Sequence, residues 1–81
     1  MEILVVDDDA ELAGLVSRFL GKEGFRPTAV HDGEAGLAEA LSGRFDLLVL
    51  DVMLPGLDGF SVLRKLREKS QMPVIMLTAR G

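Results

Sequence analysis

The chain of 81 residues contains no cysteine, no tryptophan and no tyrosine. Without cysteine, this sequence cannot form a disulfide framework, a thiolate metal site or a cysteine nucleophile. Its four aromatic residues are all phenylalanine, so a core must consist mainly of Leu, Val and Ile, within a hydrophobic content of 48%. No apolar run approaches the roughly 18 residues of a membrane span, and the acidic Glu2 argues against a signal peptide.

Positive charge is also in the minority. Nine Lys and Arg face thirteen Asp and Glu, giving a net charge of −4. Because an acidic domain repels a phosphate backbone, we do not expect direct nucleic-acid binding by this segment. A DNA-binding domain elsewhere in a longer chain stays compatible with this charge. The length fits one small domain at most.

Short apolar runs alternate with amphipathic segments along the whole chain. Strands are expected at residues 2–6, 26–31, 46–50 and 72–77, with helices between them. Continuous apolar strands are typical of a parallel sheet buried on both faces, which right-handed helical crossovers connect. The pattern therefore predicts an α/β, flavodoxin-like doubly wound parallel sheet of βαβαβαβ type. We expect the strand order 2-1-3-4, and Pro27 favours an edge position for the second strand.

The expected helices begin at aspartates and carry apolar faces. Asp8 or Asp9, Asp32 and Asp58 are the candidate N-caps. The first helix has an apolar face with helical spacing, formed by Leu12, Leu15, Val16, Phe19 and Leu20. In the third helix the expected buried side consists of Phe60, Leu63 and Leu66.

Carboxylates gather where two of the predicted strands end. Asp7 and Asp8 follow the first strand, and Asp51 follows the third. Ligands of an open parallel sheet bind beyond the carboxyl ends of the strands at the switch point, so these groups should share one crevice. Such a cluster attracts a hard cation such as Mg²⁺. Beside a metal, the Asp51 carboxylate could attack a phosphoryl group and form an acyl phosphate.

Each of these residues also has a simpler interpretation. For Asp9 a capping role is favoured, and for Asp8 alone the capping and metal-binding interpretations are about equally balanced. Thr78 ends the fourth strand, where its hydroxyl could donate to a phosphoryl oxygen or cap the strand end. His31, the only histidine, is interpreted as structural or solvated.

Four ordered motifs, VVDDDAEL, HDGEAGL, DLLVLDVMLPGLDG and PVIMLTARG, span the chain. Together they resemble the receiver domain of bacterial two-component response regulators. The stretches LDVMLPGLDG and MLTARG resemble the subfamily in which a winged-helix DNA-binding domain follows the receiver. The resemblance implies a cytoplasmic transcriptional regulator that accepts phosphate from a sensor histidine kinase and catalyses its own phosphorylation and dephosphorylation.

The resemblance also assigns roles to individual residues. Asp51 matches the phosphoacceptor, Asp8 the direct Mg²⁺ ligand, and Asp7 the carboxylate that holds metal-bound water. The backbone carbonyl of Met53 would be a further metal ligand, and Thr78 matches the switch hydroxyl. Two other positions would shape the loop after the phosphoacceptor, namely Pro55 and Gly59.

The family pattern continues with a helix, a strand carrying a lysine and an aromatic switch residue, and a last helix. This sequence ends before them, so we expect residues 1–81 to be the N-terminal portion of a receiver domain with impaired phosphotransfer. One alternative is an interaction fragment that self-associates, as a homodimer or larger, without phosphotransfer. Another is a metal-dependent phosphatase with an aspartyl nucleophile, although Met53 stands where such enzymes usually have a second acid.

Overall fold

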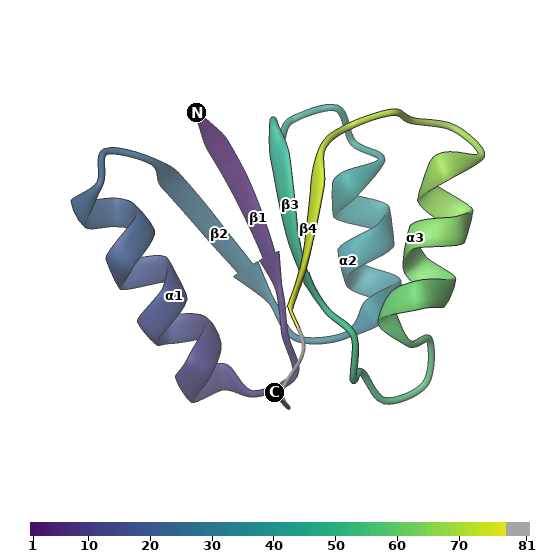
Figure 1. The fold of residues 1–81 in the computed structure, drawn as a ribbon, viewed down its shortest axis with the longest axis horizontal. Coiled ribbons are helices and arrows are strands. Elements are labelled where there is room, and N and C mark those ends of the chain that lie inside the picture. Colours follow the sequence, from purple (N-terminus) through teal and green to yellow (C-terminus); the bar gives the residue numbers. More distant parts are fainter. Residues whose placement is uncertain (78–81) are drawn as a thin grey trace.

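Four parallel strands form one sheet in the computed structural model, which describes residues 1–77 (Figure 1). They are β1 (Glu2–Val6), β2 (Arg26–Val30), β3 (Leu47–Asp51) and β4 (Val74–Leu77). The order is β2-β1-β3-β4, and every neighbouring pair is parallel. The predicted flavodoxin-like topology is therefore confirmed, and β2 lies at an edge of the sheet as Pro27 indicated.

In the described part of the chain, three helices cover the two faces of the sheet (Figure 1). Helix α1 (Ala10–Lys22) packs on one face, while α2 (Gly33–Ala40) and α3 (Gly59–Arg67) pack on the other. Within residues 1–77, none of these helices has the length and apolar character needed to cross a membrane.

Aspartates cap all three helices through side-chain oxygens. Asp9 accepts a hydrogen bond from the Leu12 N–H, which decides the first cap in favour of Asp9 rather than Asp8. Asp32 and Asp58 accept in the same way from residues three positions further on. Each cap satisfies a backbone donor that the first helical turn leaves unpaired.

The central strands bury side chains on both of their faces. Leu4, Val6, Leu48 and Leu50 face α2 and α3 in the larger cluster of core residues. Alternate residues of the same strands, including Ile3 and Val5, point to the other face and pack with Ala13 of α1. Because successive strand side chains point to opposite faces, a continuous apolar run is what this two-sided core requires.

The expected buried side of α3 was partly wrong. Phe60 is 53% exposed, whereas Val62 and Leu66 are fully buried. At 3.6 residues per turn, Phe60 lies about 200° around the helix from Val62 and therefore points to the opposite side. Leu63 is half-buried at the margin of the core.

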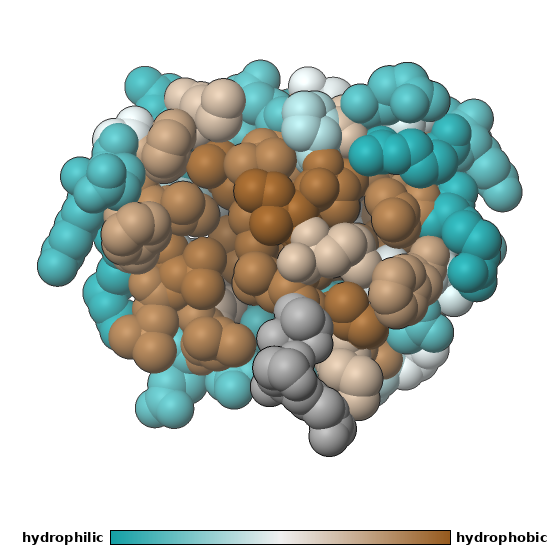
Figure 2. Space-filling view, viewed as in Figure 1, coloured by the Kyte–Doolittle hydropathy of each residue, from teal (hydrophilic) through white to brown (hydrophobic). Residues whose placement is uncertain are grey.

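Helix α1 buries only part of its apolar face. Val16 and Leu20 pack against the sheet, but Leu12, Leu15 and Phe19 are 39%, 53% and 62% exposed. Figure 2 shows hydrophobic surface running from the α1 side across the neighbouring face of the sheet. Within residues 1–77, α1 is the only helix on this face, so nothing in the described part of the chain covers its outer apolar side chains.

We expect this exposed surface to make the chain self-associate, because contiguous apolar patches are rare on monomers. Replacing Phe19 with glutamate should weaken the association about tenfold, a loss of roughly 1.4 kcal/mol. Leu41→Glu, at the end of α2 on the other side of the sheet, should have little effect. Light scattering over a range of concentrations measures both changes. A wild-type chain that stays monomeric throughout would contradict the expectation.

Candidate functional site

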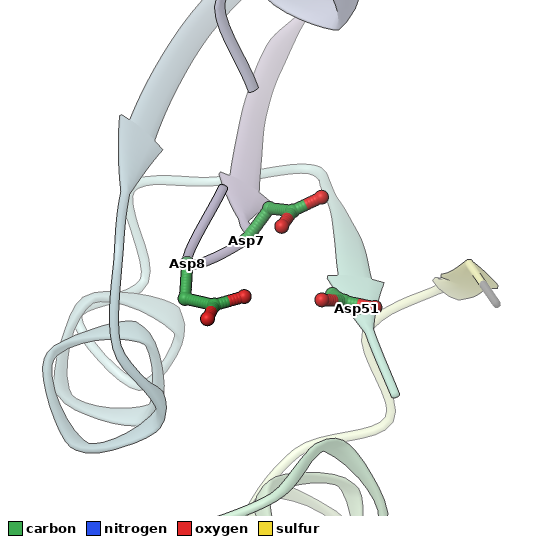
Figure 3. A group of neighbouring side chains, drawn as sticks. All are labelled: Asp7, Asp8 and Asp51. Carbon is green, nitrogen blue, oxygen red and sulfur yellow. The ribbon is translucent and has the colours of Figure 1, made fainter. Parts of the chain in front are cut away.

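Two buried aspartates meet where β1 and β3 end. Asp7 directly follows β1, and Asp51 is the last residue of β3. These strands are neighbours, with Val6 opposite Leu50, so the next residues along each strand lie side by side. Asp8 projects from the following turn, and carboxylate oxygens of Asp7, Asp8 and Asp51 lie within 4.8 Å of one another (Figure 3). The structure thus brings together the three carboxylates that the sequence singled out.

The three carboxylates line a cleft of about 730 Å³. The loop after β3 forms another part of its wall through residues 52–55, so Met53 and Pro55 both border the cleft. Leu77 at the end of β4 also lines it. Thr78, the predicted switch hydroxyl, lies outside the described residues.

Backbone amides hold the two buried carboxylates in place. The Asp9 N–H donates to Oδ1 of Asp7 at 2.9 Å, and the Met53 N–H donates to Oδ1 of Asp51 at 3.2 Å. Within residues 1–77, no other protein N–H donates to either carboxylate. Each group is therefore oriented by its own turn while keeping acceptor capacity towards the cleft.

Among residues 1–77, no Lys or Arg forms an ion pair with the carboxylates of this cleft. Asp7 and Asp51 are only 3% and 6% exposed. The ion pairs found in the described part of the chain, Arg26–Glu2 and Arg44–Glu39, involve neither of them. Two buried carboxylates and a third, exposed one, with no ion pair to Lys or Arg in the described part of the chain, fit a hard divalent cation with oxygen ligands, and Mg²⁺ is such an ion.

The pKa of Asp7 is raised above its ordinary value of 3.8. Burial is the largest cause, and the carboxylates of Asp51 and Asp8 add to it, while the hydrogen bond from the Asp9 N–H acts in the opposite direction. The charged form of Asp7 is therefore less favourable in the metal-free fold than in the unfolded chain.

Asp7 should consequently make the metal-free chain less stable as the pH rises. Its folded pKa lies above its unfolded pKa, so its contribution to stability is present below about pH 3.8 and is lost as the pH rises through the folded value. At neutral pH in EDTA, Asp7→Asn should raise the free energy of unfolding by about 1 kcal/mol, or roughly 4–8 °C in Tm. Thermal unfolding across this pH range measures the effect. An Asn variant that is less stable than wild type at neutral pH would contradict it.

Gly59, the first residue of α3, lies directly against the backbone of Asp51 and Val52. A Cβ at this position would overlap the carbonyl oxygen of Asp51 and would lie 2.8 Å from Cα of Val52. The Gly59 N–H also donates to the carbonyl of Val52 at 3.1 Å. The first turn of α3 therefore packs directly on the backbone that carries Asp51, in line with the loop-shaping role expected for Gly59.

His31 makes a contact with the site that the sequence did not reveal. Its Nδ1 lies 3.0 Å from the carbonyl oxygen of Asp7. The expectation of a structural or solvated histidine named no partner, because residues 7 and 31 are brought together only by the pairing of β1 with β2. The alternation of apolar strands was the only signal that could have suggested this pair.

Comparison with known proteins identifies relatives over almost the whole chain. The family model described as "Response regulator receiver domain" matches residues 3–81. The transcriptional regulatory protein CpxR of Klebsiella pneumoniae is 52% identical over 80 residues, which are 99% of this chain and 34% of that protein. ResD of Bacillus subtilis is 42% identical over 99% of this chain and 33% of its own length. The chain thus spans about one third of the length of these curated relatives.

Solved structures share the fold as well as the sequence pattern. The response regulator TrrA of Thermotoga maritima, in complex with Mg²⁺ and BeF, superposes with a TM-score of 0.93. It is 36% identical and is matched over 99% of this chain and 70% of that one. A structure of the histidine kinase ThkA in complex with TrrA gives a TM-score of 0.91 at 36% identity, over 99% of this chain and 70% of that one.

Proposed function

The chain belongs to the family of response regulator receiver domains, and on that premise we propose that Asp51 accepts a phosphoryl group from a sensor histidine kinase. Asp8 binds Mg²⁺ directly, together with Asp51 and the backbone carbonyl of Met53, and Asp7 acts on the metal through water. Thr78 supplies the hydroxyl that responds to the phosphoryl group.

The observation that carries this proposal is the convergence of three carboxylates within 4.8 Å at the ends of β1 and β3. Asp51 sits on the strand itself, so its nucleophilic oxygen has a fixed position at the bottom of the cleft. When bound there, Mg²⁺ neutralises charge on the oxygens of the incoming phosphoryl group. The protein supplies the nucleophile and the hydrogen bond from the Met53 N–H that orients it.

The relatives support the partner and the output that we propose. The complex of TrrA with the kinase ThkA supports a sensor histidine kinase as phosphodonor, and the regulators CpxR and ResD support an output in transcription. We propose that this occurs in the cytoplasm of a bacterium, and that DNA is contacted by an effector domain of the longer protein and not by this acidic segment. Self-association through the exposed α1 surface is compatible with this role.

The alternative of a phosphatase has less support. Position 53, two residues beyond Asp51, is a methionine that lines the cleft and offers no acidic side chain for a second catalytic step. We therefore propose phosphoacceptance rather than turnover of phosphoesters.

Because we expect residues 1–81 alone to have impaired phosphotransfer, the test uses the longer regulator that contains this segment. It is incubated with Mg²⁺ and a small-molecule phosphodonor, and its intact mass is measured. The expected result is an adduct of about 80 Da, one phosphoryl group, which EDTA prevents. A calorimetric titration with Mg²⁺ alone should show one binding site. A longer regulator that binds no Mg²⁺ and gains no adduct under these conditions would contradict the proposal.

A further inference from the structure

Two contacts join the backbone of Asp7 to the end of β2 and the residue that follows it. Its N–H donates to the carbonyl of Val30 at 3.1 Å, which is an ordinary rung of the parallel ladder. Its carbonyl oxygen lies 3.0 Å from Nδ1 of His31, a side-chain atom. Because a carbonyl oxygen can only accept, Nδ1 must carry the proton in this contact, whether the imidazole is neutral or charged.

The imidazole replaces a missing rung of the sheet. In a parallel ladder whose last rung joins Asp7 N–H to Val30, the next donor to the Asp7 carbonyl would be the Asp32 N–H. Instead, Asp32 turns the chain into α2, and its side chain caps that helix by accepting from the Ala35 N–H at 2.7 Å. Within residues 1–77, no backbone amide reaches the Asp7 carbonyl, and the ring of His31 takes its place.

This contact fixes the peptide unit that joins two of the site carboxylates. The peptide bond is planar, so the Asp7 carbonyl and the Asp8 N–H lie in one plane. Anchoring the oxygen restricts rotation about ψ of Asp7 and φ of Asp8. These two angles set the direction of the Asp8 side chain relative to that of Asp7, and therefore the spacing of oxygens offered to a cation.

We propose that His31 is a positioning residue of the acidic site: its Nδ1–H holds the Asp7–Asp8 peptide unit and thereby sets the two carboxylates for a divalent cation. His31 touches neither phosphoryl group nor metal, and acts through the backbone of Asp7. The inference rests on the proposed function for the identity of the cation, Mg²⁺, but the restriction of the peptide unit stands without it.

Three substitutions separate this role from a general effect on folding. In His31→Asn the amide nitrogen occupies nearly the place of Nδ1, so the hydrogen bond to Asp7 can persist. In His31→Gln the amide nitrogen lies nearer the place of Nε2, and in His31→Ala no donor remains. By calorimetry, the Gln and Ala variants should bind Mg²⁺ about tenfold more weakly than wild type, and the Asn variant within about twofold of it.

A second readout needs no metal. In EDTA, the NMR order parameter of the Asp8 amide should be about 0.85 in wild type and His31→Asn, and should fall below about 0.6 in the other two variants. Amides of β3 should remain rigid in all four proteins, which shows that the fold is intact.

These measurements test the proposed Mg²⁺ site and the positioning role of His31 independently. If wild type binds Mg²⁺ but His31→Ala binds it equally well with a rigid Asp8 amide, the positioning role is wrong. It is also wrong if the Asn variant behaves like the Gln variant in both readouts. If wild type binds no Mg²⁺, the proposed function fails, and the order parameters alone still accept or reject the role of His31.

Discussion

Replacing Asp51 with asparagine should reduce the phosphoryl adduct to less than about 1% of the wild-type level. The amide keeps the shape of the side chain and can still accept from the Met53 N–H, which reaches Oδ1 at 3.2 Å. It cannot act as the carboxylate nucleophile of an acyl phosphate. Because Asp51 is only 6% exposed beside another carboxylate, removing its charge should not unfold the chain.

Asp46→Asn is the matched control for this substitution. Asp46 immediately precedes β3, at the end opposite to Asp51, and its Oδ2 accepts from the Glu2 N–H at 2.8 Å. The same chemical change there should leave the adduct at the wild-type level when intact mass is measured under identical conditions. An adduct that survives Asp51→Asn in full would show that another side chain is the acceptor.

Gly59→Ala should cause a large loss of stability. The new Cβ would overlap the Asp51 carbonyl oxygen and lie 2.8 Å from the Val52 Cα. Both are backbone atoms of a buried strand end, so they cannot rotate aside as a side chain would. We expect a loss of roughly 3 kcal/mol, which lowers Tm by more than about 12 °C for a domain of this size.

Gly21→Ala provides the opposite control. Gly21 lies in α1, and a Cβ there meets no heavy atom within 4 Å. Alanine favours a helix over glycine by about 1 kcal/mol, so this variant should melt roughly 4 °C higher. Thermal unfolding followed by circular dichroism compares both variants. If Gly59→Ala unfolded at the wild-type temperature, the close packing of α3 on the strand end would be refuted.

The sheet and its acidic end could be predicted because their signals are local. The central strands β1 and β3 are mostly apolar runs, and each of the helices α1, α2 and α3 begins after an aspartate that caps it. Once the order 2-1-3-4 is expected, the ends of the first and third strands must meet, which brings Asp7 next to Asp51. The roles of Asp8, Met53 and Thr78 within that site stay predictions, since they depend on a metal and on a segment outside the described residues.

The features that the sequence did not show depend on how helices and strands are placed relative to one another. The exposure of Phe60 depends on the rotation of α3 about its axis, and apolar composition alone does not fix that angle. The exposure of Phe19 depends on what else covers the α1 side of the sheet. The contact between His31 and the Asp7 carbonyl arises because the chain leaves the ladder at Asp32, two residues after Val30, the last residue of β2.

The most direct test of the account is to identify the phosphorylated side chain chemically. Borohydride reduces an acyl phosphate to an alcohol but leaves free carboxylates intact, so a phosphorylated aspartate becomes homoserine. After treatment with Mg²⁺ and phosphodonor, peptide sequencing by mass spectrometry should find homoserine at position 51, with Asp7 and Asp8 unchanged. Homoserine at position 7, 8 or 58, with Asp51 intact, would contradict the assignment of Asp51 as the phosphoacceptor.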